Sequence, residues 1–454
     1  MSGNLAVRSE AFTGGESRLA KRVAQPLARF LHQEVSSSIL LLVATAAALI
    51  WANLGGDSYS NFWNSTVELA IGSWHPLTHE GHGLSLGLWV NDVLMVLFFF
   101  VVGLEIKHEA VAGELSDPRV AALPIVAAFG GMVVPALIYT VFNAGGAGSG
   151  GWGVPMATDI AFAVGVLTLL GSRAPQRLKI FLLTLAIADD IGAIMVIAVF
   201  YSSGFSLLWF GAAVGGLVLM YVLRQARVWY IPVYALVGAA VWYATFRSGI
   251  HATIAGVAMG LLTPAKPLIG PPALGGLQDI LAGEYQEPAA VRAATWRAKE
   301  TVPVTVRLSS LLSPWTSFLI VPIFAMSNAG VKLSSSALSD AVGSPVTWGV
   351  IAGLVIGKPI GIALFSFIAT KLKVAAMPPD TTLAQIFGVG AVAGIGFTVA
   401  LFVTSLAFDD KALADQATMG ILAASAFATL AGFLLLSFLG GRAGKAAEPE
   451  TAAP

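Results

Sequence analysis

The fold of this chain is decided by one apolar stretch, Lys179-Ile-Phe-Leu-Leu-Thr-Leu-Ala-Ile-Ala-Asp-Asp-Ile-Gly-Ala-Ile-Met-Val-Ile-Ala-Val-Phe200. It is long enough to cross a bilayer as a helix, which takes about 20 residues. Two adjacent acids, Asp189 and Asp190, interrupt it, and each carboxylate near the bilayer centre costs roughly 2.5–3.5 kcal/mol. The only other acid between residues 120 and 263 is Asp159. Such costly groups indicate that the chain handles a cation or a proton inside a membrane.

The composition extends this interpretation to the whole chain. Its 454 residues are 56% hydrophobic and 11% charged, with a mean hydropathy of +0.80, far from a soluble average. Long apolar runs recur, which predicts an all-α polytopic membrane protein rather than a barrel of alternating strands. The chain has no cysteine, so disulfides, thiolate metal sites and cysteine nucleophiles are excluded. We expect a lipid bilayer around the chain, no cofactor and no nucleic acid.

The apolar runs predict about twelve transmembrane helices. A membrane domain over 36–440 would follow a cytoplasmic leader, 1–35, and precede a disordered cytoplasmic tail, 441–454. With this orientation 21 of the 25 Lys and Arg residues fall on the cytoplasmic side, as the positive-inside rule requires. The spans are expected at 36–54, 90–109, 120–142, 152–170, 178–202, 205–223, 229–247, 250–262, 314–330, 346–370, 384–407 and 416–440.

Two connections between spans are unusual. Residues 66–88 hold two short apolar runs around a Gly- and His-rich turn, which favours a periplasmic β-hairpin, with a disordered loop as the alternative. Its histidines, His75, His79 and His82, could bind a metal, but no cysteine or acid spacing supports a site, so solvated loop histidines are expected. Residues 263–313 are proline-rich and then basic, and are predicted to form a cytoplasmic loop.

The two adjacent acids must have different surroundings. Neighbouring residues on a helix point about 100° apart, so Asp189 and Asp190 cannot face the same partner. We expect one to face an open cavity and the other a packed neighbour. The natural neighbour is Lys358, the only base deep within a predicted span, because a buried pair relieves the desolvation of both groups. Alternatively, Lys358 could extend its ammonium to the membrane interface.

Two predicted spans carry signs of interruption. The first contains Pro-Met-Ala-Thr158-Asp159, in which a proline precedes a polar pair. The second contains Ala-Gly394-Ile-Gly396, although these glycines could serve only close helix packing. One break in each half predicts inverted-topology repeats, with the interrupted helices crossing near the bilayer midplane at the functional site.

The expected chemistry is a competition between protons and a metal ion. Buried carboxylates can hold protons or a small hard cation, but not both. Binding of sodium or lithium would therefore release protons, and alternating access would make this an obligatory exchange. Asp159 would compensate the positive ends of the broken helices and Lys358 the negative ones. Asp159 could instead be a structural group that bonds a neighbouring helix.

At these motifs the chain resembles the NhaA family of bacterial sodium–proton antiporters, from about residue 30 to residue 440. The resemblance implies twelve helices, electrogenic exchange of more protons than sodium, a homodimer held largely by the β-hairpin, and a bacterial inner-membrane location. The matching motifs are Val101-Val-Gly-Leu-Glu-Ile-Lys107, Ala157-Thr-Asp-Ile-Ala-Phe162, Ala188-Asp-Asp-Ile-Gly-Ala193, Ser248-Gly-Ile-His-Ala-Thr-Ile-Ala-Gly256, Gly357-Lys-Pro-Ile-Gly361 and Ala393-Gly-Ile-Gly-Phe-Thr398.

The resemblance also assigns roles by position. It makes Asp190 the principal ligand of sodium or lithium, with Asp159 and Thr158 nearby, and it pairs Asp189 with Lys358. The remaining assignments are a pH-response region at Glu105, Glu109 and His251, and an outward-facing position at Asp92.

The chain departs from the family pattern on its cytoplasmic side. The loop before Ser313 is longer than the family leads us to expect, and Ser309 stands where some members have an acid. His108 occupies a position where a second strong base is usual. The pH threshold of the family is therefore not carried over.

Three other functions compete with a pH-regulated secondary transporter. An intramembrane aspartyl protease would resemble a Tyr-Asp helix paired with Gly-x-Gly-Asp, whereas the aspartates here follow Ala-Thr and Ala. A sodium channel or uniporter is a closer rival, because a sequence does not show alternating access. A silent structural or sensor protein is disfavoured by the complete set of polar residues. We therefore expect a transporter and not an enzyme.

Overall fold

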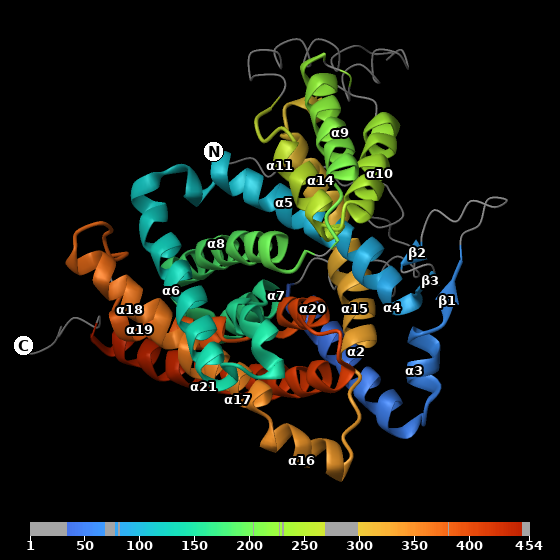
Figure 1. Ribbon diagram of the computed structural model, residues 1–454. Coiled ribbons are helices and arrows are strands. Elements are labelled where there is room, and N and C mark those ends of the chain that lie inside the picture. The colour runs from blue at the N-terminus through green and yellow to red at the C-terminus, as the bar shows by residue number, and fades with distance from the viewer. Residues whose placement is uncertain are drawn as a thin grey trace, which may run out of the picture.

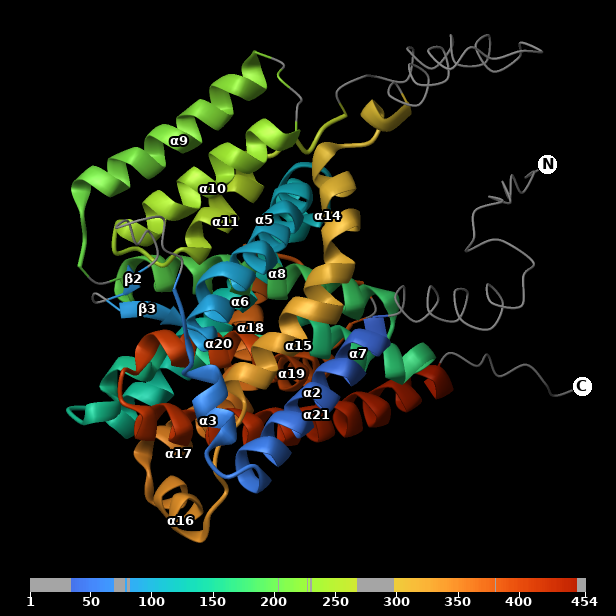
Figure 2. The same cartoon turned by 90° about the vertical axis from the view of Figure 1, so that its right-hand side faces the viewer.

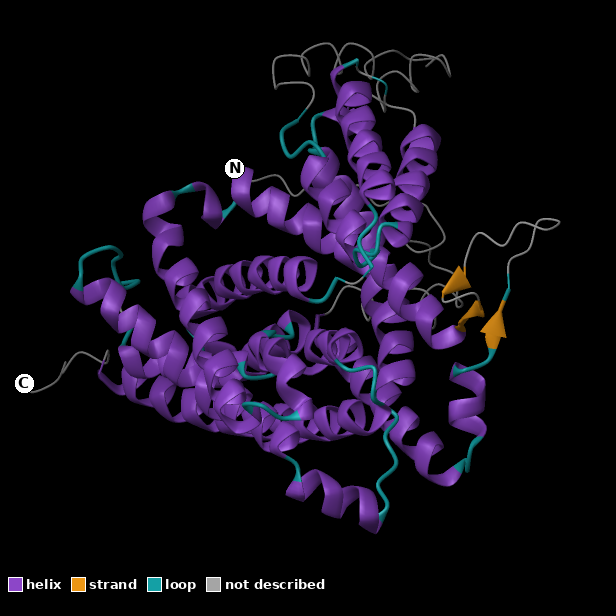
Figure 3. Ribbon diagram, in the orientation of Figure 1, coloured by secondary structure: helices purple, strands orange, loops and turns teal. Residues whose placement is uncertain are grey.

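Figure 1 shows the computed structural model, in which helices make up most of the chain and the strands form one small patch, coloured orange in Figure 3. The structure describes residues 34–68, 78–79, 82–202, 204–226, 228, 231–267, 298–379 and 381–446. The expected leader therefore lies almost entirely outside the described residues, as does most of the expected cytoplasmic loop.

The helices follow the predicted spans closely. In the first half they are α2 Glu34–Leu54, α3 Ser58–Trp63, α4 Leu86–Trp89, α5 Met95–Ala112, α6 Pro118–Asn143, α7 Ile160–Leu170, α8 Gln176–Phe200, α9 Leu207–Gln225, α10 Ile231–Arg247 and α11 Thr253–Leu262. In the second half they are α14 Val304–Trp315, α15 Val321–Asn328, α16 Ser335–Gly343, α17 Pro345–Ala352, α18 Lys358–Lys371, α19 Leu383–Ala393, α20 Phe397–Ala407 and α21 Lys411–Ala446.

Tighter and wider helical turns connect several of these elements. Within the part of the chain that the structure describes, three π-helical turns join helices into longer rods: η2 Val90–Leu94, η7 Thr316–Ile320 and η8 Gly353–Gly357. Among the same residues, three 3₁₀ segments precede or follow α-helices: η3 Glu114–Ser116, η4 Ala147–Met156 and η5 Gly171–Arg173. Because a π-turn widens a helix locally, η8 is a wider turn immediately before Lys358, within the continuous span Pro345–Lys371.

The polytopic helical class is confirmed. Among the described residues, eight helices are long and apolar enough to cross a membrane, or ten if each of two bent pairs counts as one span. These pairs are η4 with α7, bent by 43°, and α19 with α20, bent by 54°. Both breaks lie where the sequence predicted them. Helix α11 is apolar but has only 10 residues, shorter than a span.

Some boundaries differ from the prediction. The helix expected from residue 314 begins at Val304, inside the stretch expected to be a loop, because Pro303 starts the helix and α14 then packs against α5. The polar run around Ser309 had favoured a loop. At the other end of the chain α21 continues to Ala446, past the expected start of the tail.

The strands predicted within residues 66–88 form a small antiparallel sheet. Strand β3, His82–Ser85, pairs on one side with β1, Thr66–Val67, and on the other with β2, Thr78–His79. The sheet order is β1-β3-β2. After it the Ser85 hydroxyl accepts a hydrogen bond from Leu88 N, so α4 begins earlier than expected. His75 lies outside the described residues.

Glycines bring the helices around the site unusually close together. A Cβ on Gly103 of α5 would lie 2.7 Å from a backbone oxygen of α11, and a Cβ on Gly361 of α18 would overlap the Gly130 carbonyl of α6. Small residues at helix crossings allow backbones to meet in this way. Figure 2 shows α9, α10 and α11 grouped beside α5, while α7, α19 and α20 lie in the other half of the molecule.

Candidate functional site

The two breaks meet at Asp159. Its Oδ1 accepts from Phe162 N at 3.1 Å and so caps the start of α7. Its Oδ2 accepts from both the backbone N–H of Thr398, at 3.1 Å, and the Thr398 hydroxyl, at 2.5 Å, near the start of α20. The Asp159 N–H in turn donates to Ile395 O at 2.7 Å. Helix N-termini carry a partial positive charge, so this buried carboxylate compensates two helix ends at once, as the sequence predicted.

Aromatic packing keeps the two half-helices together beside this carboxylate. The rings of Phe162 on α7 and Phe397 on α20 meet edge to face, with centroids 5.3 Å apart. Farther along α20, Phe402 contacts Phe99 of α5, with centroids 5.0 Å apart. Edge-to-face pairs are favourable beyond the area they bury. The crossing is therefore fixed by polar contacts at the helix ends and by an apolar contact next to them.

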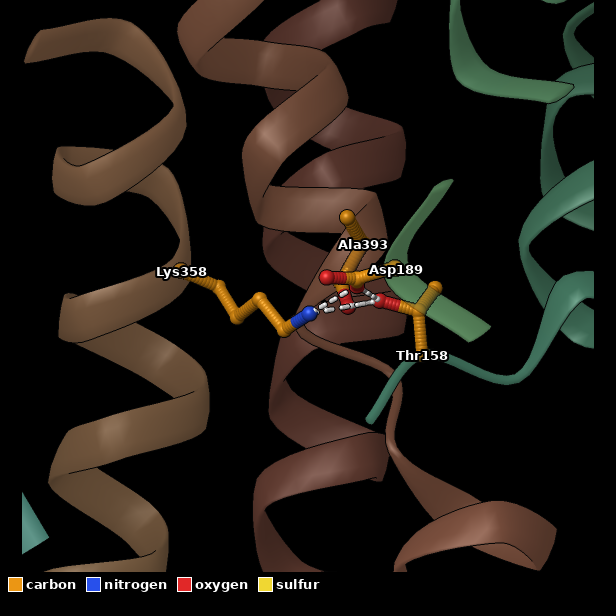
Figure 4. A network of polar contacts seen from close by, with 4 residues as sticks. All are labelled: Thr158, Asp189, Lys358 and Ala393. Carbon is orange, nitrogen blue, oxygen red and sulfur yellow. Dashed lines mark hydrogen bonds and ion pairs between the residues drawn. The ribbon is translucent and has the colours of Figure 1, made fainter. Parts of the chain in front are cut away.

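A second network links Lys358, Asp189 and Thr158 (Figure 4). The Lys358 ammonium forms an ion pair with Asp189 Oδ2 and donates to Thr158 Oγ1 at 2.9 Å. The Thr158 hydroxyl lies 2.7 Å from Asp189 Oδ2 and 2.9 Å from Ala393 O, and its one proton can go to either. Lys358 and Asp189 are 0% and 1% exposed. The expected pair of these two residues is therefore present and fully buried.

Lys358 makes no direct hydrogen bond to the helix C-termini that the sequence analysis expected it to compensate. Its ammonium was expected to compensate the negative ends of the broken helices. Its hydrogen-bonded partners are instead Asp189 and Thr158. The carbonyl of Ala393, the last residue of α19, is reached only through the Thr158 hydroxyl. The Thr158 hydroxyl thus connects a base on α18 to the C-terminal end of α19 by hydrogen bonds.

Asp190 has different surroundings from its neighbour, as the 100° rotation between adjacent residues requires. It is 6% exposed, and its Oδ1 accepts no hydrogen bond from the described residues. Asp189 Oδ1 is likewise without a donor in this part of the chain. A buried oxygen with no protein donor is suited to hold a proton or a cation.

The glycines of the second break provide space. A Cβ on Gly394 would lie 2.5 Å from Leu354 O, and one on Gly396 would lie 3.0 Å from Ala400 Cβ. Their φ angles, −67° and −86°, are open to other residues. These glycines lie at the break, and they also allow η8 to pack closely against it.

The residues assigned to a pH response lie at two ends of the α5–α11 pair. Gly256 of α11 packs against the early part of α5, and Gly260 packs one turn later, so the two helices run parallel. Glu105 and Glu109 lie in the last turns of α5, whereas His251 precedes α11. The His251 Nε2–H donates to Tyr201 O at 2.6 Å. Burial lowers the pKa of His251.

Asp92 lies in the π-helical turn η2 that precedes α5. Its backbone carbonyl accepts a hydrogen bond from the Trp242 indole at 2.8 Å. This contact joins η2 to α10, apart from the crossing of the breaks.

The sequence analysis quoted Thr398 in a motif but gave it no role. It is the second residue of α20 and its hydroxyl binds Asp159. A threonine stands beside each predicted break, at Thr158 and Thr398, and this shared feature is the signal that could have identified it. Across the described residues no three His, Cys, Asp or Glu side chains gather as a metal-binding cluster. Carboxylate, hydroxyl and carbonyl oxygens dominate the crossing, which suits a hard cation.

Comparison with known proteins gives a consistent result. The family model for Na+/H+ antiporter 1 matches residues 28–436. The Na(+)/H(+) antiporter NhaA 3 of Frankia alni is 44% identical over 429 residues, which cover 93% of this chain and 90% of the relative. The Na(+)/H(+) antiporter NhaA of Oleidesulfovibrio alaskensis is 42% identical, covering 92% and 95%. That of Koribacter versatilis is 42% identical, covering 94% and 95%.

Proposed function

This chain belongs to the Na+/H+ antiporter 1 family, and from that premise we propose how its buried aspartates exchange Na+ or Li+ for protons. It is a multi-pass membrane transporter and not an enzyme. The protease alternative has little support, because Asp159 uses both oxygens to cap helices and Asp189 pairs with a lysine. A uniporter lacks the proton step that the names of the relatives include.

One observation carries the proposal: adjacent aspartates on one helix have opposite surroundings. Asp189 Oδ2 pairs with Lys358 and Thr158, and only its Oδ1 lacks a donor, whereas Asp190 forms no ion pair with a described residue and its Oδ1 lacks a donor as well. A proton or a sodium ion can supply the missing partner of Asp190, and either excludes the other. Asp190 is therefore the principal ligand of the transported cation, with Asp159 and Thr158 close by.

Lys358 connects this competition to the rest of the site. Its ammonium is already beside Asp189 and Thr158, so an arriving cation adds positive charge next to it. Protons then leave from the same set of groups, either from both aspartates or from Lys358 together with one aspartate. Release of more protons than sodium ions taken up would make the exchange electrogenic.

The two bent pairs, one in each half of the chain, support an inverted-repeat transporter with alternating access. Twelve spans result if α10 and α11 also cross the membrane, and the breaks then meet near its midplane. The small sheet joins two copies into a homodimer. Glu105, Glu109 and His251 tune the rate with pH, and Asp92 lies on the outward side. The protein resides in the bacterial inner membrane with both termini cytoplasmic, an orientation that the positive-inside bias supports.

The test is sodium-driven proton movement in everted membrane vesicles across neutral and alkaline pH. We expect sodium or lithium to collapse an imposed pH gradient, and Asp190→Asn to lose this response while remaining folded. Asp409→Asn, an exposed acid in the loop before α21, is the matched control and should behave as the wild type. Sodium flux without proton movement would establish a uniporter, and normal exchange by Asp190→Asn would place the site elsewhere.

A further inference from the structure

The segment that leads into the first break is held by two tyrosine hydroxyls. The Tyr139 hydroxyl of α6 donates to the Gly148 carbonyl of η4 at 2.7 Å. The Tyr201 hydroxyl donates to Gly150 O at 2.8 Å and accepts from Gly153 N at 3.0 Å. Tyr201 therefore satisfies one acceptor and one donor of the same short 3₁₀ segment, and it does so from the end of α8.

The glycines of this segment make room for the hydroxyls. A Cβ on Gly153 would lie 2.7 Å from the Tyr201 oxygen, and a Cβ on Gly151 would overlap the Tyr139 hydroxyl. Between them, Trp152 stacks on the Tyr201 ring, with centroids 6.2 Å apart and planes 26° apart. Tyr201 thus contacts both the backbone and a side chain of η4.

Tyr201 is itself fixed to α8. Its N–H donates to Ile197 O at 3.2 Å, which continues the helix by one residue. Its carbonyl accepts from His251 Nε2 at 2.6 Å. Tyr201 therefore moves with α8, the helix that bears Asp189 and Asp190 about three turns earlier.

At its other end η4 stops at Met156, two residues before Thr158. The hydroxyl of Tyr201 is thus a rigid link between the two elements whose polar side chains meet at the crossing. Thr158, just after η4, contacts Asp189 in the middle of α8. Tyr201, at the end of α8, binds η4 itself, so the same two elements are joined at a second place.

We propose that the Tyr201 hydroxyl is a positioning group that sets the first interrupted helix against α8 and thereby sets the sodium affinity of the crossing. The inference rests on the proposed function and adds to it a residue that does not touch the ion. If η4 loses this link, Thr158 and Asp159 are no longer held in register with the aspartates of α8.

The substitution that tests this is Tyr201→Phe, which keeps the ring and its stacking on Trp152 but removes the hydroxyl. Two hydrogen bonds to η4 are lost, and only part of their free energy should appear in ion affinity, so we expect the KM for sodium in vesicles to rise roughly fivefold with little change in the maximal rate. Ser202→Ala is the matched control, because among the described residues the Ser202 hydroxyl, just past the end of α8, bonds only Ala198 O of that helix, at 2.8 Å. Its KM should equal that of the wild type.

A second variant approaches the link from the other side. Gly153→Ala places a methyl group against the Tyr201 oxygen and should raise the KM similarly. The double variant with Tyr201→Phe should show much less than the sum of the two effects, because both act on one contact. Additive effects would overturn the link.

Hydrogen exchange supplies a readout that needs no transport. Tyr201→Phe should speed exchange in peptides that contain the Gly153 amide and leave the middle of α6 unchanged. Faster exchange with an unchanged sodium KM would make Tyr201 merely structural and overturn the proposal. If the wild type moved no protons with sodium, the proposed function would fail. The link would then stand or fall on whether Tyr201→Phe weakens the stabilisation of the purified protein by sodium during thermal unfolding.

Discussion

Replacement of Lys358 by alanine should strongly destabilise the protein. The ammonium is fully buried and serves both Asp189 and Thr158. Removal of one partner from a buried ion pair costs about 3–5 kcal/mol, because the remaining charge stays in a low dielectric without compensation. The Thr158 oxygen also loses its donor, which adds about 1 kcal/mol. The expected loss is thus about 4–6 kcal/mol at neutral pH.

The assay is thermal unfolding of the detergent-solubilised protein, followed by the fluorescence of its 11 tryptophans. Lys332→Ala is the matched control. Lys332 also forms an ion pair, with Asp57 at 2.9 Å, but the side chains are 61% and 77% exposed. Exposed pairs contribute only about 0–1 kcal/mol, so this variant should unfold close to the wild type.

The double variant Lys358→Met with Asp189→Asn refines the test. It removes both charges and keeps similar volumes, so most of the lost stability should return. The deficit of Lys358→Ala should also shrink at low pH, because a protonated Asp189 needs no counter-charge. If Lys358→Ala unfolded at the same temperature as Lys332→Ala, the buried pair would not stabilise the fold as argued.

Three further predictions concern other contacts. Thr398→Val removes the hydroxyl that donates to Asp159 and should cost about 1.5–3 kcal/mol in thermal unfolding, whereas Thr404→Val, which loses only a bond within its own helix, should cost less. Gly361→Ala should separate α18 from α6 and cost about 1–3 kcal/mol or more; wild-type stability would mean that the helices pack less closely. Burial lowers the pKa of His251 in the folded protein, so the stability from its neutral form is complete above about pH 6.5 and is lost as the pH falls through the lower folded value. His251→Gln should flatten this part of the stability profile, and an unchanged profile would contradict it.

The sequence predicted the spans and breaks because both depend on local chemistry. Apolar length defines a span, and a proline before Thr158 and Asp159 weakens a helix wherever the chain folds. The pairing of Asp189 with Lys358 was also accessible, since a buried base needs an acid and few acids were within the membrane segments. These inferences needed no knowledge of how distant segments pack.

The rest depended on packing between distant segments. Thr398 binds Asp159 only because the two breaks meet, a contact between residues far apart in the chain. The start of α14 at Val304 was missed because its polar residues resemble a loop until α5 is seen beside them. The hydrogen bonds between Tyr201 and η4 could not be predicted for the same reason, since glycines in a sequence do not reveal which hydroxyl will approach them.

The double cap formed by Asp159 couples the two interrupted helices mechanically. One carboxylate anchors the starts of α7 and α20, so neither half-helix can shift its first turn without pulling on the other. A cation that draws this carboxylate toward Asp190 would therefore displace the starts of both α7 and α20. Under the proposed function, occupancy of the cation site would therefore be coupled to movement of both interrupted helices through one side chain.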